Sequence, residues 1–106
     1  MSLTMTTDAA FTDDVLASTV PVLVEFTAEW CPPCRMVAPV LEQISADEKN
    51  RLRVLAIDVD TNPDTTLKYQ VMGMPTLALF VNGEIVSRIL GARSRTAILR
   101  ELEPHL

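Results

Sequence analysis

Two cysteines at the junction between a strand-like run and a long amphipathic segment constrain this chain more than any other feature. They lie in Trp30-Cys31-Pro32-Pro33-Cys34, which contains both cysteines and the only tryptophan of the 106 residues. Residues 21–27 form a nearly continuous apolar run, typical of a strand covered on both faces. Residues 33–49 have apolar side chains at helical spacing. The sequence therefore predicts a strand, a tight turn and a helix, with both thiols at the helix N-terminus.

That position favours redox chemistry at the two thiols. The helix dipole and the free backbone N–H groups stabilise a thiolate, which lowers the pKa of Cys31 and makes it the predicted nucleophile. The spacing lets Cys34 attack a mixed disulfide formed on Cys31. A structural disulfide and a metal site are the alternatives. Two thiols alone cannot complete a tetrahedral zinc site, and the only histidine, His105, lies at the far C-terminus, so we expect no metal.

Length and charge exclude several classes of protein. A chain of 106 residues suits one domain, which we expect to span residues 1–106. The net charge of −5, with no cluster of Lys or Arg, argues against binding to nucleic acid or anionic membranes. The longest apolar run, residues 76–81, is too short to span a membrane. No basic segment precedes a hydrophobic stretch, so we expect no signal peptide and a cytoplasmic protein. Residues 1–4 are interpreted as a tag or as disordered, with Met1-Ser2-Leu3 as an expression remnant.

The hydrophobic periodicity predicts an α/β fold with alternating elements in the order β-α-β-α-β-α-β-β-α. Strand–helix–strand crossovers imply parallel strands in the first half, and Asn82-Gly83 predicts a type I′ hairpin in the second. The result is a central mixed β-sheet with helices on both faces. The predicted elements are a short edge strand at 3–6, a helix at 8–18 capped by Thr7 or Asp8, a strand at 21–27, a helix at 33–49, a strand at 52–59, a short helix from Asn62-Pro63 to about Tyr69, strands at 76–81 and 84–90, and a final helix capped by Ser94.

Three details of these elements are also predicted. The apolar stripe of the long helix consists of Met36, Val37, Val40, Leu41 and Ile44. Pro39 lies inside that helix, where it removes a hydrogen bond and is expected to kink the axis. Of the two neighbouring methionines, Met72 is assigned to the core and Met74 to the surface near the cysteines.

Glu25 interrupts the apolar run of residues 21–27 and is the second unusual feature of the sequence. Either it lies at a strand end that reaches solvent, or it is a buried carboxyl group with a function. The apolar neighbours on both sides favour burial.

The sequence resembles the thioredoxin family over nearly the whole chain. A lone pair of cysteines at this spacing is weak evidence, but the ordered set of segments is specific. The matching segments are Val24-Glu25-Phe26, Ala28-Glu29-Trp30-Cys31, Pro33-Cys34, Met36, Ala38-Pro39, Asp58-Val59-Asp60, Asn62-Pro63, Met74-Pro75-Thr76, Phe80, Asn82-Gly83 and Gly91-Ala92.

The resemblance implies a thioredoxin fold and assigns roles to individual residues. Cys31 is the attacking thiol and Cys34 the resolving thiol. Pro75 is a cis-proline that faces the disulfide, and Met74-Pro75 pairs with an extended substrate backbone. Glu25 is a buried acid that moves protons to or from the resolving thiol. The substrate-binding surface is a shallow apolar groove lined by Trp30, Gly73, Met74, Gly91 and Ala92, with Pro32 and Pro33 beside the disulfide.

Three residues depart from what is usual in the family. Pro32 replaces a glycine, Glu25 replaces an aspartate, and Ala56 replaces a lysine that is often paired with that acid. These departures leave the predicted fold unchanged. They bear on the reduction potential, on the partner reductase and on proton transfer.

Three functions follow from the residues and the resemblance. The first is a monomeric general dithiol–disulfide reductase without a bound cofactor, which reduces target disulfides and is recharged from NADPH by thioredoxin reductase. The second is a thiol oxidase or isomerase, because the residues between the cysteines tune the redox poise. The third is a binding subunit that uses the groove without turnover.

Overall fold

The computed structural model describes residues 3–106, and its centre is one five-stranded sheet with the strand order β1-β3-β2-β4-β5. Three helices and two short helical turns surround this sheet. The strands are β1 Thr4–Met5, β2 Val22–Thr27, β3 Arg53–Asp58, β4 Thr76–Val81 and β5 Glu84–Leu90. The helices are α1 Pro32–Asp47, α2 Pro63–Lys68 and α3 Arg95–Leu102, with a π-helical turn at Thr12–Leu16 and a 3₁₀ turn at Glu103–His105.

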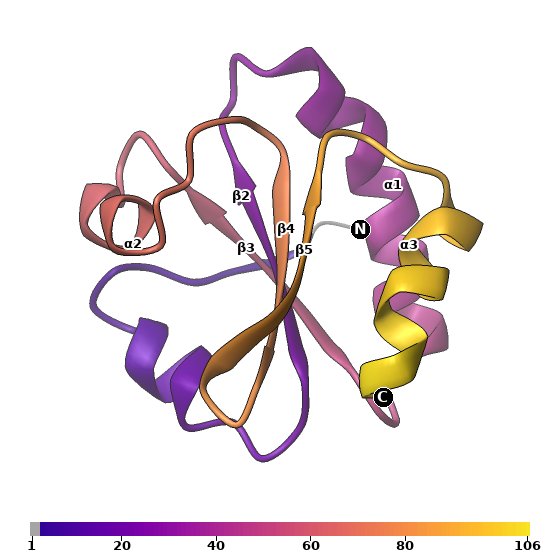
Figure 1. Cartoon of the computed structure of the whole chain (residues 1–106). Coiled ribbons are helices and arrows are strands. Elements are labelled where there is room, and N and C mark those ends of the chain that lie inside the picture. The colour runs from indigo at the N-terminus through magenta and orange to yellow at the C-terminus, as the bar shows by residue number, and fades with distance from the viewer. Residues whose placement is uncertain (1–2) are drawn as a thin grey trace.

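The sheet is mixed, as predicted. Strands β1, β3 and β2 are parallel, whereas β4 is antiparallel to both β2 and β5. Helices α1 and α3 cover one face, and α2 lies with the π-helical turn on the other (Figure 1). The predicted α/β architecture with helices on both faces is therefore confirmed, and the first strand forms the edge beside β3.

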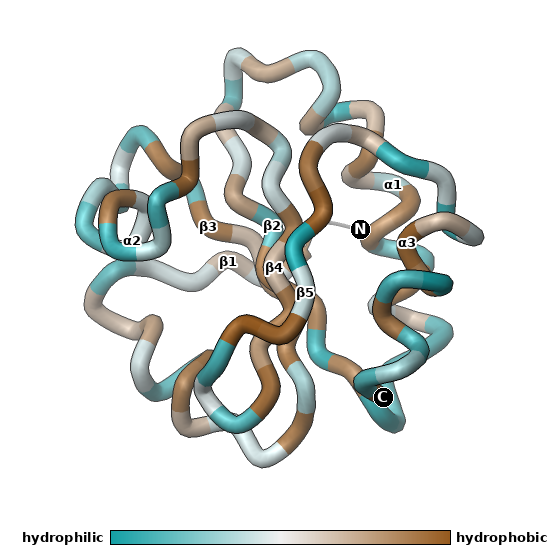
Figure 2. Tube along the Cα trace, in the orientation of Figure 1, coloured by the Kyte–Doolittle hydropathy of each residue, from teal (hydrophilic) through white to brown (hydrophobic). Residues whose placement is uncertain are grey.

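Each face of the sheet has its own apolar core, because successive side chains of a strand point to opposite faces. Hydrophobic segments follow the central strands, while hydrophilic ones lie mainly in the outer loops and helices (Figure 2). The core under α1 and α3 contains Leu23, Val37, Leu41, Ile44, Leu52, Val54, Leu77, Leu79, Ile89, Ile98 and Leu102. The core on the other face contains Phe11, Val15, Val22, Val24, Phe26, Leu55, Ile57, Ala78 and Phe80. Since Leu23 faces α1, the alternation places Glu25 on that same face.

The segment predicted as a helix at 8–18 is instead a turn followed by the short π-helical turn Thr12–Leu16. Asp8 does not cap it. The two carboxylate oxygens of Asp8 accept hydrogen bonds from the backbone N–H groups of Asp64 (3.1 Å) and Thr65 (2.9 Å), in the first turn of α2. Desolvation raises the pKa of Asp8, but the hydrogen bonds from Thr65 and Asp64 outweigh it and hold that pKa below its ordinary value.

The expected capping of α2 by Asn62 is also different. Asn62 stands at the N-cap position, but its side chain makes no capping bond to α2. Its Oδ1 accepts from the backbone N–H of Asp8 at 2.9 Å, and its Nδ2 donates to the carbonyl oxygen of Asp58 at 3.0 Å. Asn62 thus holds Asp8 in place, and Asp8 caps the helix across 56 residues of sequence.

The methionine predictions were wrong at two positions. Met36 of α1 is 72% exposed and Met72 is 95% exposed, so neither belongs to the core. The remainder of the predicted α1 stripe holds, with Val37, Leu41 and Ile44 buried. Helix α1 continues through Pro39 from Pro32 to Asp47, so it begins one residue earlier than expected and ends two earlier.

The turn and cap predictions at the C-terminal half are confirmed. Asn82 (φ 52°) and Gly83 (φ 81°) both adopt the left-handed conformation that a type I′ hairpin requires. The Ser94 hydroxyl accepts from the backbone N–H of Ala97 at 3.2 Å and caps α3. Thr4 belongs to β1, whereas residues 1 and 2 of the predicted expression remnant lie outside the described residues.

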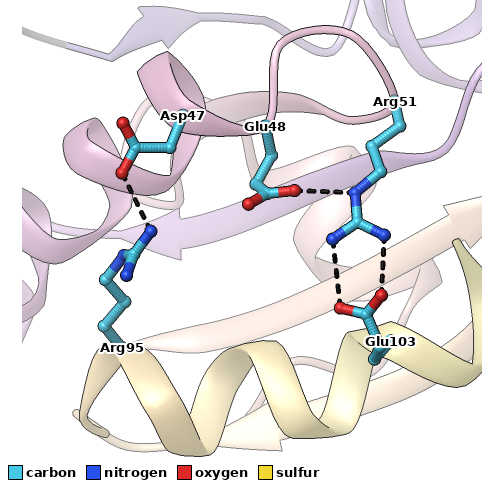
Figure 3. A network of polar contacts seen from close by, with 5 residues as sticks. All are labelled: Asp47, Glu48, Arg51, Arg95 and Glu103. Carbon is cyan, nitrogen blue, oxygen red and sulfur yellow. Dashed lines mark hydrogen bonds and ion pairs between the residues drawn. The ribbon is translucent and has the colours of Figure 1, made fainter.

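Exposed ion pairs join the C-terminal end of α1 and the turn after it to α3 and the 3₁₀ turn that follows α3 (Figure 3). Arg51, in the turn after α1, pairs with Glu48 at 2.6 Å and with Glu103 at 2.7 Å. Arg95 pairs with Asp47 at 2.8 Å. The hydrogen bonds from Arg51 lower the pKa of Glu103. Pairs this exposed contribute little to stability, so we assign them to the orientation of α3.

Candidate functional site

The two cysteines lie where β2 passes through a tight turn into α1. Cys31 is the N-cap residue of α1 with an extended backbone (φ −96°, ψ 104°), and its Sγ accepts from the backbone N–H of Cys34 at 3.3 Å. Pro32 and Pro33 occupy the first two helical positions, where an N–H has no partner inside the helix. The side chains form a disulfide with a Cα–Cα distance of 5.3 Å. The predicted placement of both sulfurs at a helix N-terminus is confirmed.

The disulfide packs against buried side chains on one side and is flanked by more exposed residues on the other. Cys31 and Cys34 are each 2% exposed and cluster with Ala28, against which Val59 and Met74 pack. Pro32 is exposed and Pro33 half-buried. The exposed surface next to the disulfide is therefore formed in part by these prolines.

Trp30 lies at the rim of the site and not in the core, as predicted. Its side chain is 61% exposed, and its Nε1 donates to Oδ2 of Asp60 at 2.8 Å. Asp60 follows β3, and its own backbone N–H donates to Oδ1 of Asp58 at 2.9 Å. Asp60 is a residue that the sequence interpretation did not assign to the site. Its position in the matching segment Asp58-Val59-Asp60 was the available signal.

The segment before β4 reaches the disulfide through Met74. The Met74–Pro75 bond is cis, Pro75 is buried, and Met74 is half-buried against the cysteine cluster. The backbone N–H of Gly91 donates to the carbonyl oxygen of Pro75 at 2.8 Å. Gly73 is also close to this region, because a Cβ there would lie 3.2 Å from the Leu90 side chain. The structure thus brings the segment 73–75 together with Gly91.

The other residues assigned to the groove differ in how they are held. Ala92 follows Gly91 and is exposed, so it extends the surface formed by the segment 73–75 and Gly91. Trp30 makes its polar contact with Asp60, in the loop after β3, rather than with this segment. The predicted groove residues therefore form one group around Met74 and Gly91 and a separate rim at Trp30.

Glu25 is buried, as predicted, at 2% exposure. It pairs in register with Ala56 of β3 and with Leu77 of β4, so neither neighbouring strand offers it a charge. Its Oε2 has no hydrogen-bond partner among the described residues. Burial without a compensating charge raises the pKa of Glu25 from 4.5 to about 7.

Glu25 and Cys34 line the same cavity, which has a volume of about 550 Å³. The cavity lies between the α1-facing side of the sheet and the first turns of α1, and Ala38 and Ala56 also line it. Glu42 and Asp58 contribute carboxyl groups that the sequence interpretation did not assign to the site. Glu42 lies on α1 two turns after Cys34, a spacing that places both on one helix face.

Comparison with known proteins decides the family. The thioredoxin family profile matches residues 2–104. The chain belongs to the thioredoxin family. It is 55% identical over 96 residues to thioredoxin from Mycobacterium tuberculosis (strain ATCC 25618 / H37Rv), covering 91% of this chain and 83% of that protein. It is 51% identical over 102 residues to thioredoxin from Mycolicibacterium smegmatis, covering 94% and 91%.

A third relative links the thioredoxin unit to a reductase. The bifunctional thioredoxin reductase/thioredoxin from Mycobacterium leprae is 53% identical over 96 residues, which cover 91% of this chain and 21% of that protein. This chain is a thioredoxin-type thiol–disulfide oxidoreductase, and its redox group is the Cys31–Cys34 disulfide. The predicted fold class and enzyme class are confirmed.

Residues 3–106 also bear on two other classes of protein. None of their helices is long and apolar enough to cross a membrane. Within the same residues, no group of three or more His, Cys, Asp or Glu side chains is arranged to hold a metal ion.

Proposed function

We propose that this thioredoxin is a general reductant of protein disulfides in the cytoplasm, recharged from NADPH by thioredoxin reductase. The observation that supports it most directly is the position of Cys31 at the N-cap of α1, with its sulfur accepting the N–H of Cys34. A sulfur held there is stabilised as a thiolate, which is the attacking species in disulfide exchange. The Mycobacterium leprae relative, named for both activities, supports a reductase partner.

The reaction proceeds in two exchanges. The Cys31 thiolate attacks one sulfur of the target disulfide, forming a Cys31–target disulfide and releasing the first target thiolate. Cys34 then attacks Cys31 Sγ, which releases the second target thiolate and closes the Cys31–Cys34 disulfide. Two electrons pass from the dithiol to the target, and the two thiol protons go to the two target thiolates through solvent or a carboxyl group.

Glu25 is the proposed carrier of the proton at Cys34. A general base works best when its pKa is near the working pH, and the pKa of Glu25 is about 7. Glu25 and Cys34 line one cavity, so water can connect the carboxyl group to the thiol. In this role Glu25 takes the proton from Cys34 before the second exchange and returns it to solvent afterwards.

The proposed substrate surface surrounds the disulfide on the side of the prolines. It consists of Trp30, Pro32, Pro33, Gly73, Met74, Pro75, Gly91 and Ala92. Met74 supports this assignment because it packs against the cysteine cluster and remains half-exposed. We further propose that residues 1–106 form one domain that acts as a monomer, without binding nucleic acid or membranes.

Trapping a target tests the roles of the two thiols. Cys34→Ser leaves the first exchange intact and blocks the second, so it should accumulate a covalent complex with a disulfide-bonded target such as insulin. Cys31→Ser, the matched control, should trap none. Mass spectrometry identifies the linked residue. A target linked to Cys34 in the wild-type or Cys31→Ser protein would reverse the assignment.

An oxidase or isomerase remains the second candidate because of Pro32, which replaces the residue usual between the cysteines. Proline removes an N–H from the turn and fixes its own φ near −65°, so it alters the environment of Cys31. Equilibrium with glutathione measures the reduction potential and separates the candidates, since an oxidase is the more strongly oxidising. Failure to reduce insulin with dithiothreitol would favour a binding subunit without turnover.

A further inference from the structure

The cavity behind the disulfide is a site with features that thiol exchange does not require. Its floor is formed by Glu25 of β2 and Ala56 of β3, and its wall by Cys34 and Ala38 of α1. Met5 of β1 lies at its edge. A volume of about 550 Å³ falls within the range of roughly 300–1,000 Å³ that is usual for small-molecule sites. This cavity opens to solvent, and its surface is mostly apolar with charged groups among the lining residues, a composition found in ligand sites.

The charges around this cavity are unbalanced. Glu25, Glu29, Glu42 and Asp58 line it, and the single cation among the lining residues is Arg35. The Arg35 guanidinium donates to the carbonyl oxygen of Glu29 at 2.6 Å and thus lies at the rim. Asp58 already accepts the backbone N–H of Asp60 at 2.9 Å. Among the described residues, no cation therefore offsets the burial of the innermost carboxyl group, that of Glu25.

One acceptor in the cavity is both buried and unpartnered. Oε2 of Glu25 is inaccessible and has no hydrogen-bond partner among the described residues, although buried polar atoms are nearly always paired. Ala56, in register beside Glu25, is too short to offer one. Glu25 thus lines an acidic cavity, and one oxygen of its buried carboxyl group lacks a donor.

We propose that this cavity binds a small aliphatic ammonium ion, whose N–H donates to the carboxyl group of Glu25 where it lines the cavity and whose carbon chain packs on Ala38, Ala56 and Met5. A linear primary ammonium combines the positive charge, the donors and the narrow apolar stem that these surroundings complement. A metal ion fits less well, since within residues 3–106 the carboxyl groups do not gather into a set of three around one point. The inference is independent of thiol exchange, because the site is complete in the oxidised protein.

Binding and ionisation of Glu25 are linked. The pKa of Glu25 is about 7 without a ligand, and a bound cation favours the carboxylate and lowers that pKa. By linkage, the affinity for the ammonium rises with pH through the range in which free Glu25 ionises. Glu29, Glu42 and Asp58 add attraction, and Arg35 opposes it from the rim. An occupied site therefore holds an ionised Glu25 beside Cys34.

The test uses n-butylammonium chloride and the oxidised full-length chain, with binding followed by calorimetry and by amide NMR shifts. We expect saturable binding at pH 8 that weakens on the order of tenfold at pH 5.5, where Glu25 is protonated and the amine remains charged. Glu25→Gln should lose at least tenfold in affinity, whereas Glu84→Gln, an equal charge change on the exposed β5, should not. Tetramethylammonium, which has no N–H donor, should bind at least tenfold more weakly.

A second variant keeps the test independent of the effect of Glu25→Gln on folding. Ala56→Leu retains Glu25 and places a larger side chain beside it in the cavity, so it should weaken binding at least tenfold and leave the far-ultraviolet circular dichroism unchanged. Equal affinity in Glu25→Gln and wild type would overturn the proposal, as would undiminished binding to Ala56→Leu. Equal binding of tetramethylammonium and butylammonium would also overturn it, because a general attraction to the acidic surface predicts that result.

Discussion

Replacing Glu25 with glutamine should change how stability depends on pH. The carboxyl group is 2% exposed, it has Ala56 as its neighbour on β3, and burial raises its pKa from 4.5 to about 7. The pKa of Glu25 is higher in the folded state than in the unfolded state. The contribution of Glu25 to the free energy of unfolding is therefore fully present below pH 4.5, where the carboxyl group is protonated in both states. It is lost progressively as pH rises from 4.5 to about 7. Glutamine has a similar shape and does not ionise in this range.

The magnitude follows from the same pKa values. Each unit between the folded and unfolded pKa corresponds to about 1.4 kcal/mol, so ionisation of Glu25 costs roughly 3 kcal/mol by pH 7. Water that enters the adjoining cavity screens the carboxylate, which makes this figure an upper value. The stability difference between Glu25→Gln and wild type should therefore shift by up to about 3 kcal/mol in favour of the variant between pH 4 and pH 7.

Denaturant unfolding of both proteins at several pH values measures this difference. Both proteins are kept oxidised, so that the thiols do not titrate. Glu84→Gln, on the exposed β5 strand, controls for the loss of one negative charge. The pH-dependent part of the difference is the relevant quantity, because any constant cost of burying an amide cancels. A difference that stays flat from pH 4 to pH 7 would refute the reasoning and mean that Glu25 is solvated or paired with a cation.

Three further changes test other parts of the structure. Pro32→Gly should preserve the circular dichroism spectrum and shift the reduction potential measured against glutathione, because it restores an N–H and backbone freedom at the first helical position. An unchanged reduction potential together with unchanged reductase kinetics would contradict this. Asp8→Ala should lower the denaturant midpoint and speed hydrogen exchange of the α2 amides that it caps, and unchanged exchange would mean that the cap is not maintained in solution. Gly83→Ala should destabilise the protein by about 1–2 kcal/mol, and by more than Gly91→Ala. Both glycines have positive φ, but only at Gly83 would a Cβ lie 3.2 Å from the Leu16 carbonyl oxygen. Equal unfolding midpoints of the two variants in urea would show that this close approach is relieved.

The elements whose signals are local were predictable from the sequence. Strand β4 has the predicted bounds because its apolar run ends at a turn, and the Asn82-Gly83 turn requires two residues that tolerate positive φ. Ser94 caps α3 through an N–H three residues away. The position of the two cysteines at the start of α1 was predictable for the same reason, because a strand, a turn and a helix N-terminus lie within a short segment.

Whether a methionine is buried depended on which parts of the chain cover it. Met36 and Met72 match an apolar pattern, yet both are exposed, because periodicity identifies a helix face or a turn without specifying what packs on it. Asp8 has the composition of a local N-cap, but it caps α2 through contacts across 56 residues of sequence. Such contacts depend on the register between distant segments, which no local pattern contains.

The candidate site also has features that follow from local sequence and features that depend on distant contacts. The sequence by itself determined the residues that react, because the chemistry of two thiols at a helix N-terminus depends on spacing and on local backbone geometry. The apolar run around Glu25 was sufficient to predict its burial. Only the tertiary structure decided that Glu25 shares a cavity with Cys34, that Ala56 lies beside it, and that Glu42 and Asp58 surround the same space. The physical reason is that a cavity and its electrostatic field arise from the pairing of β2 with β3 and from the packing of α1 on that pair.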